Sequence, residues 1–541
     1  MRPANGVVQF RPGPHIPPFD ANSLAGGTFW TNCAHDALRL EIIRNMRSST
    51  RFRRRAAATF LAGTILIGGA TAPASAAPNV PQLPAVLGLP GLPSADAGDG
   101  TGTGAGGDGD GGAEGGDASG SLGALGSSDD SPAIDEAFYD TSTVTAGAPG
   151  SILRTAAAAT APMPPDLDYP LPSSVTKVLY STTDMHGNPI PVSGYMVEPS
   201  VPWTGAGERP TVVIGRGTVG QGDQCAPSRN WPLENQADPF TSGRLVNLEG
   251  LYDWVFAGAG VRVFVTDYVG MGTPGMHTYM NRAEQAHAML DGARAARNLS
   301  GGNGKVAFYG HSQGGGASAA AVEEAANYAP DLQVAAAYAS APPADLDAVQ
   351  RNIDGSDLVG AIGFTINGLA ARYPQLAPIM DANMSERGKA TLEDLSTMCT
   401  DQITSTYGHQ RTSEWTKDGR SLDAMLRDLP EGEAAMNDQF IGHGVPAAPT
   451  MIVSGRHDLN VEFQQAKDLA ANWCANGGQV FYRDDVLPKI DSYNHFAQAV
   501  SGAPFGVGFI LAMFNDAPVV GACTVSPIPG GSGEIPIPGS S

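Results

Sequence analysis

The feature that most constrains this chain is a strand-like segment that runs directly into a serine turn and then a helix-like segment. The apolar segment Lys305–Tyr309 enters the turn, and the small residues of Ala317–Ala326 leave it as a helix-favouring run. A serine on so tight a turn has a strained backbone, and small residues two positions before and after it avoid clashes. The alternative is a glycine-rich turn with an incidental serine. The turn consists of Gly310, His311, Ser312, Gln313 and Gly314.

A serine hydroxyl is a weak nucleophile, so it needs a base to take its proton and an acid to orient that base. In α/β-hydrolases the chain order is serine, acid, histidine, and the acid follows a late strand. Asp458 lies in the turn after the apolar run Thr450–Val453. His495 is the only histidine beyond Asp458, and it lies in a polar, loop-like stretch. We therefore predict Ser312 as the nucleophile, His495 as the base and Asp458 as the acid.

Each of these assignments has an alternative. Asp458 is also a residue type that favours turns for local reasons, and His495 could be a surface histidine. His457 is next to Asp458, but adjacent side chains usually point apart, so we interpret it as structural. Three other aspartates are alternatives for the acid, but they lie shortly before His495 and not directly after the run Thr450–Val453. They are Asp484, Asp485 and Asp491.

Two backbone N–H groups should stabilise the negative charge that develops during attack by a serine. One is expected from Gln313, the residue after the nucleophile, and the other from the loop after the third strand. That strand is predicted to end at Ile214, and the glycine-rich loop Gly215–Asp223 follows it. We favour the Gln221–Asp223 end of the loop, with Gly217 as the alternative. The candidate donors are thus Gln313, Gly222, Asp223 and Gly217.

Other segments resemble the secretory lipase family, typified by fungal lipase A. The most specific match is Asp223–Ser228, which contains a Cys-Ala-Pro-Ser element and follows Gly217-Thr218 and Gly220. The resemblance extends from about Phe138 to Cys523. Further matches are Phe138-Tyr139, Gly150–Arg154 and Val178–Asp184.

The resemblance implies an α/β-hydrolase fold, a helical cap and hydrolysis of acyl esters. Its serine–aspartate–histidine triad would fall on Ser312, Asp458 and His495, and its second oxyanion donor near Asp223. Four cysteines lie beyond the N-terminal leader, and four cysteines allow three pairings. The resemblance favours the pairs Cys225–Cys399 and Cys474–Cys523. Neither a Cys-x-x-Cys motif nor a histidine-rich spacing indicates a metal site.

The N-terminal quarter has the composition of a targeting segment and a spacer. Residues 46–77 combine an arginine cluster, a short apolar core and an Ala-Ser-Ala cleavage sequence, typical of a secretory signal. Its apolar stretch is short and rich in glycine, so we expect no integral membrane span. We expect translation to begin at Met46, which makes residues 1–45 an untranslated or disordered leader. Residues 78–135 form a Gly/Asp/Pro-rich linker that cannot bury a core.

The folded part is expected over residues 136–541, with a loose tail from about residue 525. Strand-like and helix-like segments alternate, which implies an α/β fold with a mostly parallel sheet flanked by helices. Helix-like segments dominate residues 342–440. This segment is far longer than a usual connection between two strands. We interpret them as a cap inserted above the catalytic edge, with a purely structural insertion as the alternative.

The sequence therefore predicts a secreted or cell-envelope serine hydrolase of carboxylic acyl esters, either a triacylglycerol lipase or a carboxylesterase. Its substrate would be an acyl ester or lipid, and it would need no cofactor. The net charge of −22 would repel nucleic acid and anionic lipid surfaces. One alternative is an acyltransferase that uses the same triad. Another is a non-catalytic envelope binding protein of the same fold, against which the intact triad argues.

Overall fold

The computed structural model describes residues 136–158, 172–230, 249–485, 487–490 and 493–523. Internal contacts divide the chain into residues 1–60 and 61–541, and every described residue belongs to the second unit. The expected leader, signal segment and linker, and the tail from residue 525, lie outside the described residues.

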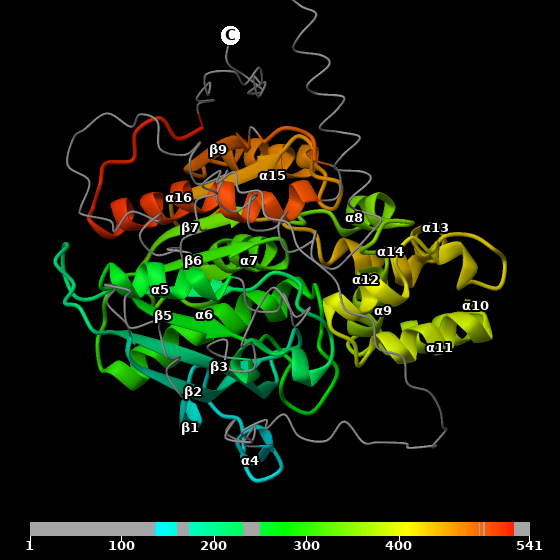
Figure 1. The fold of residues 1–541 in the computed structure, drawn as a ribbon, viewed down its shortest axis with the longest axis horizontal. Coiled ribbons are helices and arrows are strands. Elements are labelled where there is room, and N and C mark those ends of the chain that lie inside the picture. The colour runs from blue at the N-terminus through cyan, green and yellow to red at the C-terminus, as the bar shows by residue number, and fades with distance from the viewer. Residues whose placement is uncertain (1–135, 159–171, 231–248, 486, 491–492, 524–541) are drawn as a thin grey trace, which may run out of the picture. The chain divides into compact units, whose positions relative to one another are not determined.

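Nine strands of the described chain form one sheet in the order β1-β2-β3-β5-β4-β6-β7-β8-β9 (Figure 1). The first three strands pair antiparallel, β3 pairs antiparallel with β5, and the strands from β5 to β9 run parallel. The bounds are β1 (Ile152–Ala158), β2 (Pro172–Thr183), β3 (Pro189–Pro199), β4 (Thr211–Gly215), β5 (Arg262–Thr266), β6 (Val306–His311), β7 (Val334–Ser340), β8 (Thr450–Gly455) and β9 (Val480–Asp485).

Helices cover both faces of the sheet because its strands are apolar on both faces. On β4, Val213 belongs to one core, and Val212 and Ile214 belong to the core on the opposite face, as the two-residue period of a strand requires. The first core includes residues of α6 (Arg282–Ser300), α7 (Gln313–Tyr328) and α15 (Phe463–Ala475). The second includes residues of α5 (Gly250–Gly258) and α16 (Asn494–Phe514).

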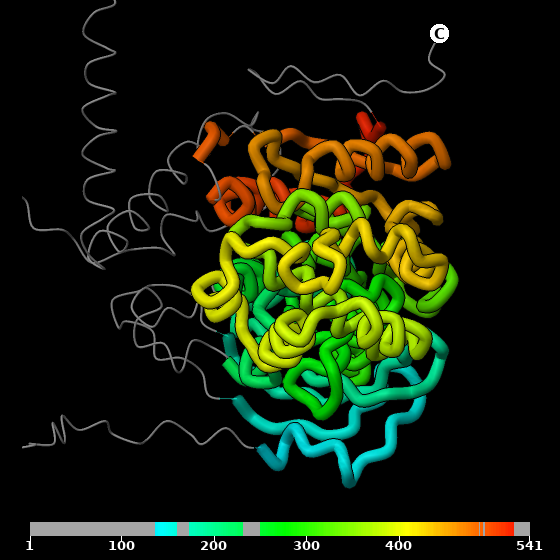
Figure 2. Tube along the Cα trace, turned by 90° about the vertical axis from the view of Figure 1, so that its right-hand side faces the viewer, coloured from blue at the N-terminus to red at the C-terminus, as the bar shows by residue number. Residues whose placement is uncertain are grey.

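The segment between β7 and β8 is helical, and it forms a body with its own apolar core, drawn mostly in yellow in Figure 2. This core also takes in Tyr279 and Met280, which precede α6, so the cap packs on the part of the chain that contains the sheet. The cap elements are α8 (Leu346–Ile353), α9 (Gly360–Ala370), α10 (Leu376–Asn383), α11 (Glu386–Leu395), α12 (Thr400–Thr406), η3 (Thr412–Glu414), α13 (Leu422–Arg427) and α14 (Pro430–Asn437). The remaining short helices are α4 (Glu136–Tyr139), η1 (Asp223–Cys225) and η2 (Pro227–Arg229).

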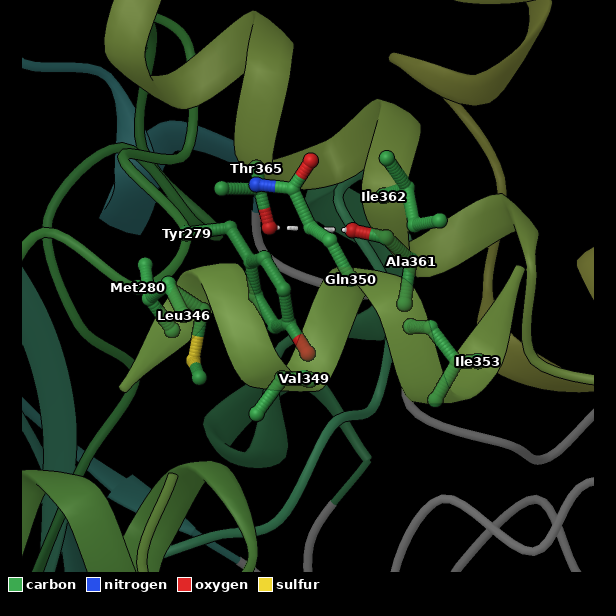
Figure 3. Close-up of a pocket in the computed structure, with 9 residues that line it drawn as sticks. All are labelled: Tyr279, Met280, Leu346, Val349, Gln350, Ile353, Ala361, Ile362 and Thr365. Carbon is green, nitrogen blue, oxygen red and sulfur yellow. Dashed lines mark hydrogen bonds between the residues drawn. The ribbon is translucent and has the colours of Figure 1, made fainter. Parts of the chain in front are cut away.

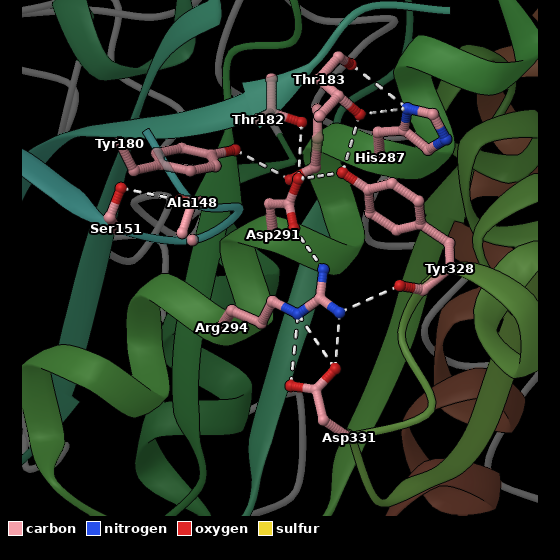
Figure 4. Close-up of polar contacts among 12 residues, drawn as sticks. Ala148, Ser151, Tyr180, Thr182, Thr183, His287, Asp291, Arg294, Tyr328 and Asp331 are labelled. Atoms are coloured by element: carbon pink, nitrogen blue, oxygen red, sulfur yellow. Dashed lines mark hydrogen bonds and ion pairs between the residues drawn. The ribbon is translucent and has the colours of Figure 1, made fainter. Parts of the chain in front are cut away.

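A buried carboxylate joins the end of β2 to α6 and α7 (Figure 4). Asp291 on α6 accepts hydrogen bonds from Thr182 Oγ1 at 2.8 Å and from Tyr328 Oη at 2.7 Å. It also pairs with Arg294, whose guanidinium reaches Asp331 after α7. Burial raises the pKa of Asp291, and these donors are what offset the cost of burying its charge. The cluster thus fixes α6, which delivers the chain to the elbow strand.

Helix α16 differs from the expectation for the stretch around His495. The sequence predicts a loop through His495, but the helix begins at Asn494, so that His495 lies in its first turn. Asn494 holds the incoming loop: its Oδ1 accepts from Ile490 N at 2.7 Å, and its Nδ2 donates to Pro488 O. Of the described helices, only α16 is long and apolar enough to cross a membrane, and 56% of its apolar window is buried. Its residues pack in the second core, as those of a core helix do.

Candidate active site

Ser312 occupies the strained turn that the sequence predicts. It lies between the last residue of β6 and the first of α7, with φ of 57° and ψ of −123°. A Cβ atom on Gly310 would lie 2.2 Å from Gly314 O, and one on Gly314 would lie 2.0 Å from Gly215 O. Larger side chains at either position would therefore force the turn apart. This packing keeps the serine in a conformation that L residues rarely adopt.

A chain of hydrogen bonds links the three residues predicted as a triad. His495 Nε2 lies 2.8 Å from Ser312 Oγ, and His495 Nδ1 lies 2.7 Å from Asp458 Oδ2. With Nδ1–H donating to the carboxylate, Nε2 is the acceptor for the serine hydroxyl. Asp458 and His495 are buried, whereas Ser312 is partly exposed. The hydroxyl is therefore the one of the three groups that an incoming molecule can reach directly.

The turn after β8 orients Asp458. Its Oδ1 accepts from the backbone N–H groups of Asn460 at 2.8 Å and Val461 at 2.9 Å, which leaves Oδ2 for the histidine. The alternative acid Asp484 pairs instead with Arg456 at 2.7 Å. His457 is exposed, whereas its neighbour Asp458 is buried.

Two side chains support His495 in ways that the sequence did not indicate: His311 of the elbow turn and Gln498 of α16. The His311 ring lies 4.6 Å from the His495 ring, and burial lowers the pKa of His311 well below its usual value. His311 Nδ1 lies 3.0 Å from Ser340 Oγ, which also accepts from Gln498 Nε2 one turn beyond His495. Gln498 further donates to Val453 O on β8. These contacts fix the first turn of α16 against the carboxyl ends of β7 and β8.

The candidate oxyanion donors differ in whether their backbone N–H groups already have a hydrogen-bond acceptor. Gln313 is the first residue of α7, so its backbone N–H has no acceptor within the helix. At the favoured end of the loop, the Gln221 and Gly222 N–H groups both point to Met398 O in the cap, at 2.9 and 3.4 Å. Burial raises the pKa of Asp223, whose carboxylate accepts from the Gly272 backbone. The Gln221 and Gly222 N–H groups are therefore engaged elsewhere, whereas the Asp223 N–H has no acceptor within the described residues.

The Gly217 end of the loop lies beside the elbow. A Cβ atom on Gly217 would lie 3.5 Å from His311 O, immediately before the serine. The Gly217 N–H donates to Glu249 Oε2 at 3.0 Å, and burial raises the pKa of Glu249. The next backbone N–H is that of Thr218, for which no acceptor lies within the described residues.

A buried ion pair holds the start of this loop. Arg216 Nη2 lies 2.6 Å from both Asp253 Oδ2 and Tyr195 Oη, and Nη1 donates to Glu249 O at 2.7 Å. Tyr268 Oη donates to Arg216 O. The signal in the sequence was a charged residue between two loop glycines, but its partners on β3 and α5 are distant in the chain.

His277 orients the side chain of Gln313. Its Nδ1 donates to Val269 O at 2.9 Å, and its Nε2 accepts from Gln313 Nε2 at 3.2 Å. Burial lowers the pKa of His277 to about 4, so the ring is neutral at pH 7 and can accept that bond. Nothing in the spacing of the sequence indicated this contact.

The Cys-Ala-Pro-Ser segment links the loop to the sheet and to the cap. Cys225 forms a disulfide with Cys399, and Cys474 forms one with Cys523, which are the pairs that the resemblance implied. The Ser228 hydroxyl donates to Asp267 after β5, and Ser228 N donates to Asp267 Oδ1 at 2.8 Å. Among the described residues, no group of three or more His, Cys, Asp or Glu side chains could hold a metal ion.

Comparison with known proteins agrees with this architecture. A sequence model described as secretory lipase matches residues 246–522, a little over half of the chain. A probable inactive lipase of Mycobacterium tuberculosis is 29% identical over 360 residues, which cover 64% of this chain and 74% of that protein. A secreted triacylglycerol lipase of Malassezia furfur is 26% identical over 307 residues, covering 55% and 76%.

Among solved structures, the chain is similar to lipase A of Candida antarctica in its closed state. The TM-score is 0.60 at 19% sequence identity, over 70% of this chain and 86% of that one. The likeness confirms the predicted α/β-hydrolase fold: a large, mostly parallel sheet flanked by helices.

Proposed function

The chain belongs to the secretory lipase family, and on that premise we propose that it is a secreted serine hydrolase of carboxylic acyl esters. The observation that carries the proposal is the continuous hydrogen-bond chain from Ser312 through His495 to Asp458, which starts at a strained and partly exposed serine. The substrate class is the esters of triacylglycerol lipases and carboxylesterases. The word inactive in the name of the Mycobacterium relative concerns that protein.

In the first half of the reaction, Ser312 Oγ attacks the ester carbonyl carbon while its proton passes to His495 Nε2. Asp458 keeps Nδ1–H oriented and stabilises the imidazolium that forms. The tetrahedral oxyanion accepts hydrogen bonds from Gln313 N–H and from the Gly217–Thr218 end of the loop, where we assign the donor to Thr218 N–H. Collapse of the intermediate expels the alcohol, which takes the proton from His495.

In the second half, water attacks the acyl-enzyme carbonyl and gives its proton to His495 Nε2. The same donors stabilise the second oxyanion, and collapse returns the proton to Ser312 as the carboxylic acid leaves. Atoms and charge balance without any cofactor: ester and water give acid and alcohol.

The test is hydrolysis of p-nitrophenyl esters of graded acyl length by the purified protein, beside Ser312→Ala. We expect turnover that depends on chain length and a loss in the variant of at least about a thousandfold. The length profile distinguishes an esterase from a lipase. Absence of turnover by a folded wild-type protein would contradict the proposal and favour the binding-protein alternative.

A further inference from the structure

Glu249 is a partly buried carboxylate that the proposed reaction does not use. It directly precedes α5, and its side chain lies against the loop after β4. Its Oε2 accepts from Gly217 N at 3.0 Å, and a Cβ atom on Gly217 would lie 2.8 Å from its Oε1. Both carboxylate oxygens are therefore close to the glycine that lies beside the elbow. A hydrogen bond to a carboxylate is about twice as strong as one between neutral groups, so this contact can hold the loop.

The backbone of Glu249 is anchored to a buried ion pair. Arg216 Nη1 donates to Glu249 O at 2.7 Å, and Tyr252 N donates to the same oxygen at 3.0 Å. The Arg216 guanidinium also pairs with Asp253, and both of these side chains are buried. Because these bonds fix the backbone from which the Glu249 side chain extends, its carboxylate has a defined place beside the loop.

The carboxylate of Glu249 lies within electrostatic reach of the triad. Burial raises the pKa of Glu249, and the positive charges of Arg216 and of a protonated His495 act against that shift. Gly217, which the carboxylate contacts, lies in turn beside His311 of the elbow turn. Glu249 therefore lies where the loop after β4, the elbow and the first turn of α16 come together.

The peptide after Gly217 is held from the cap side as well. Thr218 O accepts from Thr400 Oγ1 at 2.8 Å, and Thr218 Oγ1 lies 2.7 Å from Tyr279 Oη. Tyr279 packs against α8 and α9, where it lines a small, mostly apolar cavity (Figure 3). The Thr218 N–H lies between the contacts of Glu249 and those of the cap, and it has no acceptor in the part of the chain that the structure describes. One unused donor is thus fixed from both sides.

From these contacts we propose that Glu249 is a positioning residue of the oxyanion hole: its carboxylate holds the Gly217 N–H and thereby keeps the Thr218 N–H directed at the oxygen of the ester carbonyl. The inference rests on the proposed ester hydrolysis and on Thr218 as its second donor. Without the carboxylate, the Gly217 N–H loses its acceptor, and the peptide can turn towards another one. The oxyanion forms only in the transition state, so misplacing its donor lowers kcat and leaves KM nearly unchanged.

The experiment compares Glu249→Gln and Glu249→Leu on a p-nitrophenyl ester. In the leucine variant we expect kcat to fall about thirtyfold and KM to stay within about twofold of wild type. Glutamine keeps a carbonyl oxygen that can accept from Gly217 N, so kcat should stay within about fivefold of wild type. A purely structural role would reduce the folded fraction and leave kcat per folded molecule unchanged. Glu249→Ala gives the same comparison if the leucine variant does not fold.

A second measurement reports on the oxyanion hole directly. An alkyl trifluoromethyl ketone forms a tetrahedral adduct with the nucleophilic serine, and the adduct places an anionic oxygen where the oxyanion of the reaction forms. The inhibition constant of this ketone should therefore rise in Glu249→Leu by about the same factor as kcat/KM falls. In Glu249→Gln both quantities should stay close to wild type.

The matched control is Glu198→Leu, the same chemical change at a carboxylate that pairs with Arg262. Arg262 is the first residue of β5, at the opposite edge of the sheet from the loop after β4. Its kcat and inhibition constant should equal those of wild type. Wild-type kcat per folded molecule in Glu249→Leu would overturn the inference, and so would an equal loss in the glutamine and leucine variants. Both outcomes leave ester hydrolysis intact, whereas lack of turnover by the folded wild-type protein would overturn the proposed function and this inference with it.

Discussion

At the residue scale, the site depends on the different hydrogen bonds that the two carboxylate oxygens of Asp458 accept. One oxygen accepts from the turn backbone and the other from His495. In Asp458→Asn the carbonyl oxygen can still serve the turn, but the amide nitrogen cannot accept from Nδ1–H. We expect kcat to fall by about 10³–10⁴-fold with little change in stability.

The matched control for that variant is Asp484→Asn, which alters the alternative acid that pairs with Arg456. Steady-state kinetics and thermal melts of both variants measure the effect. A large loss of kcat in Asp484→Asn, with Asp458→Asn close to wild type, would show that the acid has been wrongly assigned.

The lowered pKa of His277 should make the free energy of unfolding depend on pH. Its pKa is lowered to about 4 by burial, whereas an unfolded histidine takes up a proton near 6.5. Between these values the unfolded state binds more protons, so stability falls as the pH is lowered through this window. The contribution between pH 7 and pH 5 is about 2 kcal/mol.

Urea unfolding of wild type and His277→Gln at the two pH values measures this contribution. The variant should lose less stability than the wild type on acidification. If both proteins lose the same free energy of unfolding, His277 is not the group responsible.

At the element scale, the loop after β4 is held by the cap as well as by the sheet. Besides the Cys225–Cys399 disulfide, Thr400 Oγ1 donates to Thr218 O at 2.8 Å. Gln221 Nε2 bridges His277 O and Phe364 O, both at 3.0 Å. The cap therefore determines the geometry of the assigned oxyanion donors.

Replacing both cysteines of that disulfide by serine should lower kcat/KM by about tenfold or more and stability by about 2–4 kcal/mol. The control removes Cys474 and Cys523, which lie far along the chain from the loop. It should lose comparable stability and keep its activity per folded molecule. Equal activity losses in the two double variants would mean that the first disulfide has no specific role at the site.

The structural features that could be predicted from the sequence are those formed by residues close together in the chain. The elbow, β8 with its aspartate and the helical insertion carry local signals, and the structure brings Ser312, Asp458 and His495 together. The start of α16 was missed because the Asn494 side chain holds the preceding loop through contacts that a polar stretch does not reveal. The supports of Gln313 and Arg216 come from distant segments, so no spacing in the sequence indicated them.

At the scale of the whole molecule, the described core begins with α4. Phe138 and Tyr139 are buried, and Tyr139 Oη lies 3.0 Å from Ser228 Oγ, next to the loop disulfide. A chain that begins at residue 130 should therefore keep kcat/KM within about twofold of the full chain. Kinetics and melting of both chains measure this.

A shorter chain that begins at residue 146 is the comparison for that prediction. It lacks both aromatic side chains and should lose about 3 kcal/mol or more of stability. If it is as stable as the longer chain, the aromatic contacts of α4 do not anchor the core. If the chain from residue 130 fails to fold, residues before the described core contribute to it.

The most direct test of Ser312 as the nucleophile is covalent labelling by an alkyl fluorophosphonate, followed by intact mass measurement and peptide mapping. We expect one adduct per chain, on Ser312, which is absent in Ser312→Ala and forms far more slowly in His495→Ala. An adduct on another residue, or none on a folded wild-type chain, would contradict the assignment of Ser312 as a nucleophile activated by His495.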